Sequence, residues 1–159
     1  MCVSIMKRVL IVFDSTYGNT ERLAKEIGNG IQESGLAWVQ VINIKEIDDH
    51  DLSPFDGVLF GCPVHAFRAT RGIRRAVKTA AKKGLEGKLV AAFDTYQSPN
   101  HKGKAVNQIR DMLRKKASGV KFFSHDLTAV VCKHEGPLDA KEPARAREFG
   151  QEFAQALGE

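Results

Sequence analysis

The stretch "FDSTYGNTERLAKEI", Phe13 to Ile27, decides how the rest of the sequence is interpreted. An apolar run stops at Asp14, and apolar residues resume at helical spacing from Leu23. Five residues of the intervening turn carry a hydroxyl, an amide or no side chain: Ser15, Thr16, Gly18, Asn19 and Thr20. One such residue is enough to cap a helix. Five of them favour an anion site, because a helix N-terminus offers unpaired N–H groups and partial positive charge.

Strand-like and helix-like segments alternate along the chain. The apolar runs of strand length are "RVLIVFD", "AWVQVINI", "DGVLFGC", "KLVAAFD" and the second half of "FFSHDLTAVVCK". Apolar residues at helical spacing follow in four places: Leu23–Ile31, Ile73–Ala81, Val106–Leu113 and Phe149–Leu157. This alternation predicts an α/β fold with a five-stranded parallel sheet, covered by helices on both faces. The doubly wound order 2-1-3-4-5 suits it, and ligands of such sheets bind beyond the carboxyl ends of the strands, at the switch between strands 1 and 3.

Length and composition predict an ordinary globular protein. The 159 residues, 43% of them hydrophobic, fit one domain over 1–159, with residues 1–6 as a loose tail. No apolar run approaches the roughly 20 residues of a membrane span. The residues before the first strand contain no long apolar stretch, so we expect no secretory signal. The three cysteines include no CxxC pair, which favours a reducing, cytoplasmic location. We expect Cys62 and Cys132 to be small buried residues.

The opening turn lacks the two common nucleotide-loop motifs, GxGxxG and GxxxxGK[ST]. Instead, "STYGNT" after "VLIVF" resembles the phosphate-binding loop of flavodoxins, which bind FMN. "FGCPVHAFRATRG", Phe60 to Gly72, resembles the first flavin loop of that family, and "FDTYQSPNHKGKAV", Phe93 to Val106, resembles the second. The resemblance covers nearly the whole chain. It implies a short-chain, flavodoxin-like fold with FMN as the cofactor.

The resemblance also implies a set of cofactor-binding residues. The phosphate loop supplies Ser15, Thr16, Tyr17, Gly18, Asn19 and Thr20; the first flavin loop supplies Pro63, Val64, His65, Ala66 and Phe67; the second supplies Asp94, Thr95 and Tyr96. Tyr96 matches the family's tyrosine and is the expected stacking residue, with His65 and Phe67 as alternatives. Asp94 replaces a frequent glycine. No catalytic or metal-binding residue is expected.

The other four histidines have no metal-ligand spacing, and we expect them on the surface: His50, His101, His125 and His134.

A basic stretch follows the first flavin loop. Between Gly57 and Leu85 there is no acidic residue, and the basic ones are Arg68, Arg71, Arg74, Arg75, Lys78, Lys82 and Lys83. The spacing of five of them predicts one stripe along a helix, flanked by Arg74: Arg68, Arg71, Arg75, Lys78 and Lys82. Flavodoxins are typically acidic, so we expect an acidic redox partner protein, or an anionic substrate, to dock near Arg68, Arg71 and Arg75. The stretch lacks interleaved aromatics, so a nucleic acid is not an expected partner. A membrane is not an expected partner either, because no apolar run is long enough to span one. We expect a monomer or weak dimer.

The predicted function is a flavodoxin-like electron carrier between protein partners, in which the flavin performs the chemistry. One alternative is an enzyme, a small FMN-dependent NAD(P)H:quinone-type reductase, against which the compact first loop argues. A second alternative is a flavodoxin-like module without cofactor that only binds proteins, against which the intact phosphate loop argues. The sequence leaves open whether the protein is an enzyme.

Overall fold

The computed structural model describes residues 6–159. A parallel sheet runs through its centre, formed by β1 (Lys7–Phe13), β2 (Ala37–Asn43), β3 (Gly57–His65), β5 (Leu89–Tyr96), β6 (Lys121–Phe122) and β7 (Leu127–Val130). The strand order is β2-β1-β3-β5-β6, and β7 also pairs with β5. All of these pairs are parallel. The predicted doubly wound order is therefore confirmed, with β6 and β7 together as the fifth strand. The predicted loose tail, apart from Met6, lies outside the described residues.

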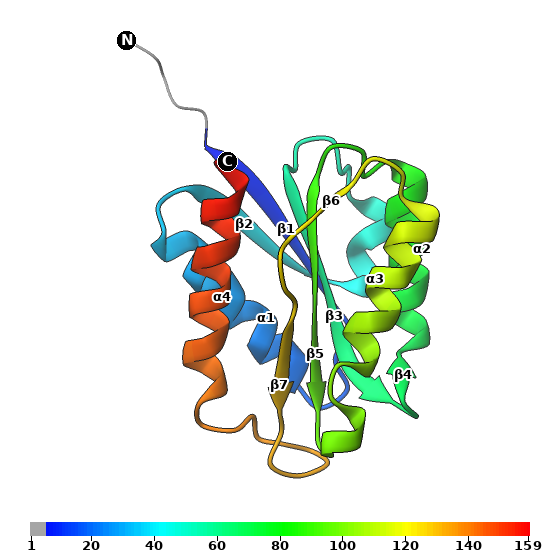
Figure 1. Cartoon of the computed structure of the whole chain (residues 1–159), viewed down its shortest axis with the longest axis vertical. Helices are drawn as coiled ribbons and strands as arrows, with labels where there is room; N and C mark the ends of the chain where they lie inside the picture. The colour runs from blue at the N-terminus through cyan, green and yellow to red at the C-terminus, as the bar shows by residue number, and fades with distance from the viewer. Residues whose placement is uncertain (1–5) are drawn as a thin grey trace.

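Two helices cover each face of the sheet (Figure 1). On one face lie α1 (Asn19–Glu33) and α4 (Glu142–Leu157), and on the other α2 (Arg71–Lys83) and α3 (Lys104–Lys116). Two short 3₁₀ helices, η1 (Ile44–Asp49) and η2 (Pro99–His101), lie in the connections. Within residues 6–159, no helix has the length and apolarity needed to cross a membrane.

Each face has its own apolar core. Leu23 and Ile27 of α1 pack with Phe153 of α4 on one side of the sheet, and Ile73 of α2 packs with Ile109 of α3 on the other. All five of these side chains are fully buried. The helical faces predicted from apolar spacing are therefore the faces that contact the sheet.

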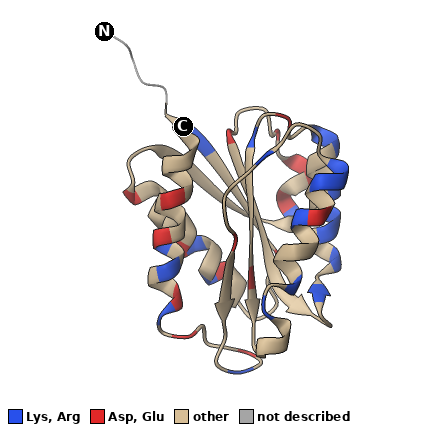
Figure 2. Cartoon of the chain, in the orientation of Figure 1, with Lys and Arg blue, Asp and Glu red and all other residues tan. Residues whose placement is uncertain are grey.

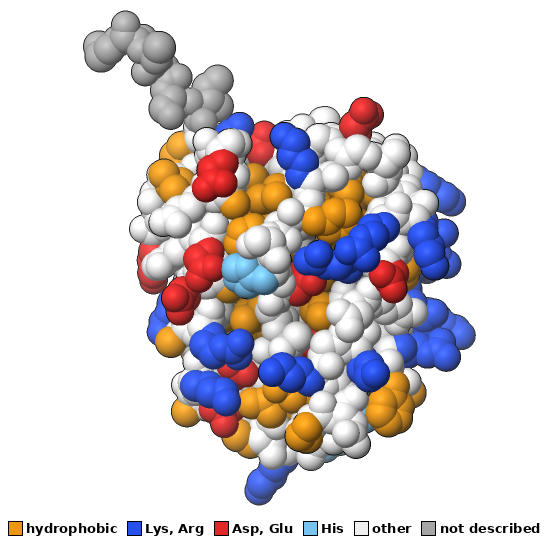
Figure 3. Space-filling view, in the orientation of Figure 1, with side chains coloured by type: hydrophobic (Ala, Val, Ile, Leu, Met, Phe, Trp, Pro, Cys, Tyr) orange, Lys and Arg blue, Asp and Glu red, His pale blue; other side chains and the backbone are white. Residues whose placement is uncertain are grey.

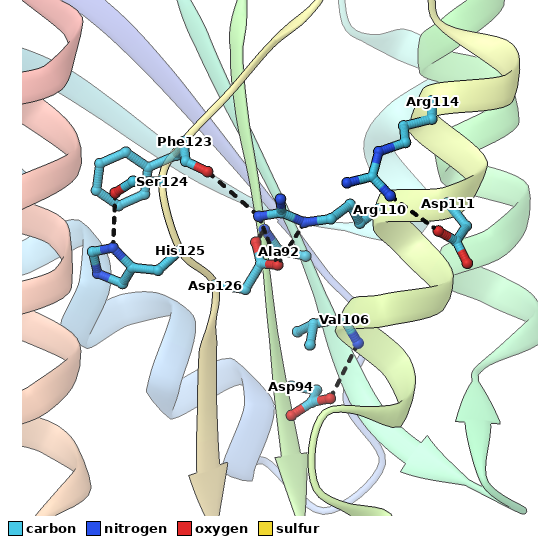
Figure 4. Close-up of polar contacts among 10 residues, drawn as sticks. All are labelled: Ala92, Asp94, Val106, Arg110, Asp111, Arg114, Phe123, Ser124, His125 and Asp126. Carbon is cyan, nitrogen blue, oxygen red and sulfur yellow. Dashed lines mark hydrogen bonds and ion pairs between the residues drawn. The ribbon is translucent and has the colours of Figure 1, made fainter.

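The fifth strand is split by Asp126. Its Oδ1 accepts a hydrogen bond from the Ala92 N–H of β5 at 3.0 Å, and its Oδ2 accepts one from Arg110 Nε at 3.0 Å (Figure 4). A side-chain carboxylate thus takes the place that a backbone carbonyl would have in the ladder. The chain leaves the sheet after β6 and rejoins it at Leu127.

α1 and α4 approach each other closely at two glycines. A Cβ added to Gly30 would lie 2.0 Å from the Arg147 carbonyl oxygen, and one added to Gly150 would lie 2.1 Å from the Ile27 carbonyl oxygen. Real Cβ atoms do not approach backbone atoms this closely. The absence of side chains at these positions is what lets the two helices pack backbone against backbone.

Two sequence expectations are wrong. Arg68 does not begin the basic helix, because it lies in the two-residue strand β4 (Arg68–Ala69), antiparallel to the end of β3. The helix starts after Thr70, whose hydroxyl accepts from the Ile73 N–H and caps it. Cys132 is exposed rather than buried, because β7 ends at Val130, whereas Cys62 is buried as expected.

Candidate functional site

A cavity of about 260 Å³ lies where β1, β3 and β5 end. Its lining includes eleven of the predicted cofactor-binding residues: Ser15, Thr16, Tyr17, Asn19, Thr20, Pro63, Val64, His65, Ala66, Thr95 and Tyr96. Four further residues complete it: Gln97, His101, Val131 and His134. The three loops expected to act together therefore meet at the switch point of the sheet.

The loop after β1 is held in shape by Ser15. Its Oγ accepts hydrogen bonds from the Gly18 N–H at 3.1 Å and from the Glu21 N–H at 3.3 Å. Gly18 has φ of 89°, a left-handed conformation in which glycine is favoured, and is the residue before α1. Gly18 does not itself line the cavity but fixes the turn that does. The Ser15 hydroxyl hydrogen and the exposed Thr16 hydroxyl remain available to donate to a ligand.

A buried hydrogen bond joins the first loop to the loop after β5. Thr20 Oγ1 and Thr95 Oγ1 lie 2.8 Å apart, and both residues are buried. Either hydroxyl can be the donor, which leaves the hydrogen of the other free for a ligand. Tyr96, the next residue, is half-buried at the cavity wall, and burial together with the nearby Glu142 raises its pKa.

A fourth segment, residues 131–138, also borders the site and was not predicted. The Tyr17 hydroxyl and His134 Nε2 are hydrogen-bonded at 3.1 Å, and Asn19 Nδ2 donates to the Glu135 carbonyl at 3.1 Å. Gly136 lies so close to Asn19 that a Cβ there would be 2.4 Å from the Asn19 Oδ1. This segment therefore covers the outer side of the phosphate-loop residues. His134 is exposed, as expected of a surface histidine, but it also forms part of the cavity wall.

Only part of the first flavin loop lines the cavity. Pro63, Val64, His65 and Ala66 line the cavity, whereas Phe67 does not. The Phe67 side chain is 59% exposed and packs edge-on against the ring of His101, with 4.5 Å between the ring centroids. Phe67 therefore lies outside the rim of the cavity, while His101, also expected to be a plain surface residue, lines it.

Residues 10–129 match the family described as the flavodoxin domain. The chain belongs to the flavodoxin family. It is 30% identical over 152 residues to a flavodoxin from Clostridium saccharobutylicum. The match covers 92% of this chain and 95% of that protein. It is also 25% identical to the protein named NAD(P)H dehydrogenase (quinone) from Archaeoglobus fulgidus, over 91% of this chain and 83% of that one. Among solved structures, a flavodoxin from the domain Archaea superposes with a TM-score of 0.81 at 22% identity, over 96% of this chain and 99% of that one, which shows the shared fold.

Asp94 of this flavodoxin domain does not face the cavity. It is fully buried on the side of α3, where its Oδ2 accepts from the Val106 N–H at 3.1 Å (Figure 4). Its Oδ1 has no hydrogen-bond partner among the described residues. Burial raises the pKa of Asp94 to about 7, and burial also raises the pKa of its neighbour on β3, Cys62, to about 12. Asp94 thus braces the start of α3, and the Cys62 thiol is buried in its protonated form.

The lining of the cavity suits a phosphorylated aromatic ligand. Among the described residues that form it, none is acidic, and none is lysine or arginine. Hydroxyl and amide groups gather at the N-terminus of α1, where the helix dipole favours an anion. Val64, Ala66, Val131 and Tyr96 provide apolar and aromatic surface beside them. Within residues 6–159, no three potential metal ligands converge.

A larger hollow, of about 560 Å³, lies at the opposite ends of β1 and β2, beside Arg8, Trp38 and Phe55. It has neither a helix N-terminus nor converging hydroxyl groups. We therefore assign the ligand site to the smaller cavity, where polar donors and aromatic surface occur together.

Proposed function

We propose that the protein binds FMN in the 260 Å³ cavity and acts as an electron carrier between protein partners. Flavodoxins generally bind FMN. The observation that carries the proposal is the meeting of three loops, after β1, β3 and β5, around one cavity that contains neutral donors and no carboxylate. A carboxylate there would repel a phosphate dianion, and each neutral donor stabilises it.

Each part of the site has a distinct role in this proposal. Ser15, Thr16 and Asn19 would donate to the phosphate at the N-terminus of α1. Tyr96 and Val64 would contact the flavin ring and keep water from it. The flavin supplies the redox chemistry, and the protein supplies binding, orientation and the electrostatic environment. No side chain of the site is required as an acid or base for electron transfer.

The proposal is tested by purifying the protein without denaturants and recording its absorption spectrum. We expect the bands of bound flavin, one FMN per chain, and reversible photoreduction under anaerobic conditions. A colourless protein that also fails to bind added FMN would overturn the proposal. It would favour the cofactor-free interaction module instead.

A second candidate is an FMN-dependent NAD(P)H:quinone-type reductase. The similarity to the Archaeoglobus fulgidus protein of that name supports it. Steady-state oxidation of NADH and NADPH by the FMN-loaded protein, with a soluble quinone as acceptor, separates the two functions. An electron carrier shows negligible turnover with NAD(P)H alone as donor, whereas a reductase turns over many times per flavin.

We also propose that the protein works in the cytoplasm. Cys62 and Cys132 are free thiols in the structure, and free thiols are typical of reducing compartments. Fractionation of the source cells, with the protein detected by antibody, tests this location.

A further inference from the structure

The turn between β3 and β4 holds an aromatic residue in an unfavourable backbone conformation. His65 pairs with Arg68, so Ala66 and Phe67 are the two central residues of a tight hairpin. Their φ angles are 49° and 63°, both positive. Such two-residue turns favour asparagine and glycine, and side chains with a Cβ are strained there. A strained position that presents a large exposed aromatic side chain points to a role in binding.

Phe67 lies next to the cavity without being part of it. Its neighbours His65 and Ala66 line the cavity, and so does His101, against whose ring Phe67 packs. The rest of the phenyl ring faces solvent. Figure 3 shows an apolar patch at the lower right of the molecule, near the place of β4 in Figure 1, with basic side chains above it. A protein that covered Phe67 would therefore also lie against the wall of the cavity.

Basic side chains surround this turn. Arg68 follows Phe67 directly and Arg71 begins α2, while Lys102 and Lys104 flank the start of α3. The Ala69 N–H donates to Gln108 Oε1 at 2.8 Å, which ties the turn to α3. All four cations are exposed, and none has an ion-pair partner in the part of the chain that the structure describes.

We propose that Phe67 and the cations Arg68, Arg71, Lys102 and Lys104 form the docking surface for an acidic electron-transfer protein. This inference rests on the proposed electron-carrier function, since such a partner has to approach the flavin site. Exposed aromatics at the centre of an interface, with charged residues around them, are the usual carriers of binding energy and orientation. The surface suits a protein better than a single-stranded nucleic acid, because one aromatic residue makes no stacking series.

The test measures binding of an acidic [2Fe–2S] ferredoxin by titration calorimetry, with basic cytochrome c as the opposite-charge probe. FMN content is determined first, and both the FMN-loaded and the FMN-free chain are titrated. We expect the ferredoxin to bind at about 0.01 M salt and to dissociate at about 1 M, where charges are screened within roughly 3 Å. Cytochrome c is expected not to bind.

Three variants locate the surface. Phe67→Gly is expected to weaken ferredoxin binding about tenfold, the loss of one interface anchor, while its FMN affinity stays unchanged and its unfolding temperature does not fall. Reversal of Arg68 and Arg71 to glutamate is expected to abolish ferredoxin binding. The matched control, reversal of Arg22 and Lys25 to glutamate on α1, changes the net charge equally and is expected to weaken binding less than threefold.

Several results would overturn the docking surface. One is that the Arg68/Arg71 reversal binds ferredoxin as tightly as the wild type does. Another is that the α1 control loses as much ferredoxin affinity as the Arg68/Arg71 reversal. A loss of FMN affinity in Phe67→Gly would show that Phe67 covers the flavin instead. Tight binding of DNA or of anionic lipid vesicles, without binding of the ferredoxin, would assign the surface to another class of partner. A chain that binds ferredoxin but no FMN would contradict the electron-carrier function and leave the surface standing.

Discussion

The two faces of the sheet carry helices of very different charge. On one face, α1 and α4 each contain two basic and three acidic residues. On the other, α2 contains six basic and no acidic residues, and α3 contains five basic and one acidic residue. Figure 2 shows this contrast, with blue concentrated on the α2 and α3 side. The excess of positive charge in the protein is therefore confined mainly to one face.

The two faces of the sheet also differ in how closely their helices pack and in how their charged side chains are paired. α1 and α4 meet at Gly30 and Gly150, and Glu26 of α1 forms an ion pair with Arg147 of α4 at 3.8 Å. On α2, the exposed cations have no ion pair within residues 6–159. On α3, by contrast, Arg110 pairs with Asp126 at 3.0 Å and Arg114 with Asp111 at 3.4 Å. The comparison indicates that the α1/α4 face is built for stability, while α2 keeps repelling charges that a partner can neutralise.

The largest effect is expected where the two helices of the stable face touch. Gly150→Ala places a Cβ 2.1 Å from the Ile27 carbonyl oxygen, so α1 and α4 must separate. Overpacking costs about 1–3 kcal/mol, and against rigid backbone we expect at least about 3 kcal/mol. Urea unfolding measures this loss. The control is Gly158→Ala, where the added Cβ would be in ordinary contact, 3.5 Å from the Gln155 carbonyl oxygen. A comparable loss in the control would mean that the close helix contact is not the cause.

The second effect concerns the buried Asp94 on the basic face. Its pKa is raised from 3.8 to about 7 by burial, so the folded state favours the protonated form. The contribution of Asp94 to stability is therefore greatest below about pH 4 and declines as the pH rises to about 7. A pKa shift of this size corresponds to about 4 kcal/mol of folding free energy, which is lost when Asp94 ionises in the folded protein. Asp94→Asn removes the charge but must bury an amide. We therefore expect the free energy of unfolding to rise by about 2 kcal/mol at pH 8.

Urea unfolding of wild type and Asp94→Asn across pH 4 to 8 isolates this residue, because the other titrating groups are shared. We expect the difference in the free energy of unfolding to grow with pH over this window. A constant difference would show that Asp94 titrates at its ordinary pKa in the folded protein.

The smallest effects compare single charges on the two faces. Glu26→Gln breaks the ion pair with Arg147 and is expected to cost about 0.5 kcal/mol. Lys78→Gln on α2 removes one of the repelling cations. We therefore expect the free energy of unfolding at low salt to stay the same or to rise by a few tenths of a kcal/mol. Thermal unfolding at low and high salt measures both. Equal losses in the two variants would contradict the contrast between the faces.

The sequence predicts the sheet order and the helical faces because apolar spacing reports directly which residues contact the sheet. It does not predict the split of the fifth strand, since this depends on the Asp126 carboxylate reaching β5 and Arg110 of α3. Both contacts join segments that are distant along the chain. The start of α2 was predictable from Thr70, a favourable capping residue directly before it.

The functional site, like the fold, was predictable from the sequence only in part. The loops after β1, β3 and β5 were predictable, because the ends of parallel strands meet at one edge. Asp94 lies near the same edge, but its side chain does not line the cavity, because consecutive strand residues face opposite sides of the sheet. Thr95 therefore reaches α1, while Asp94 reaches α3. His134 was missed because its place depends on the hydrogen bond to Tyr17, and no local pattern reports such a contact.

The most direct test of the FMN site compares FMN with riboflavin, which lacks the phosphate, by fluorescence titration. FMN is expected to bind far more tightly than riboflavin. Thr16→Val removes one exposed hydroxyl of the phosphate loop, and hydrogen bonds to charged groups contribute about 1.5–3 kcal/mol. FMN affinity should therefore fall about tenfold to a hundredfold, with riboflavin affinity unchanged and Thr16→Ser close to wild type. Equal wild-type affinity for the two ligands, or equal losses in Thr16→Val, would contradict the assignment of the phosphate to this loop.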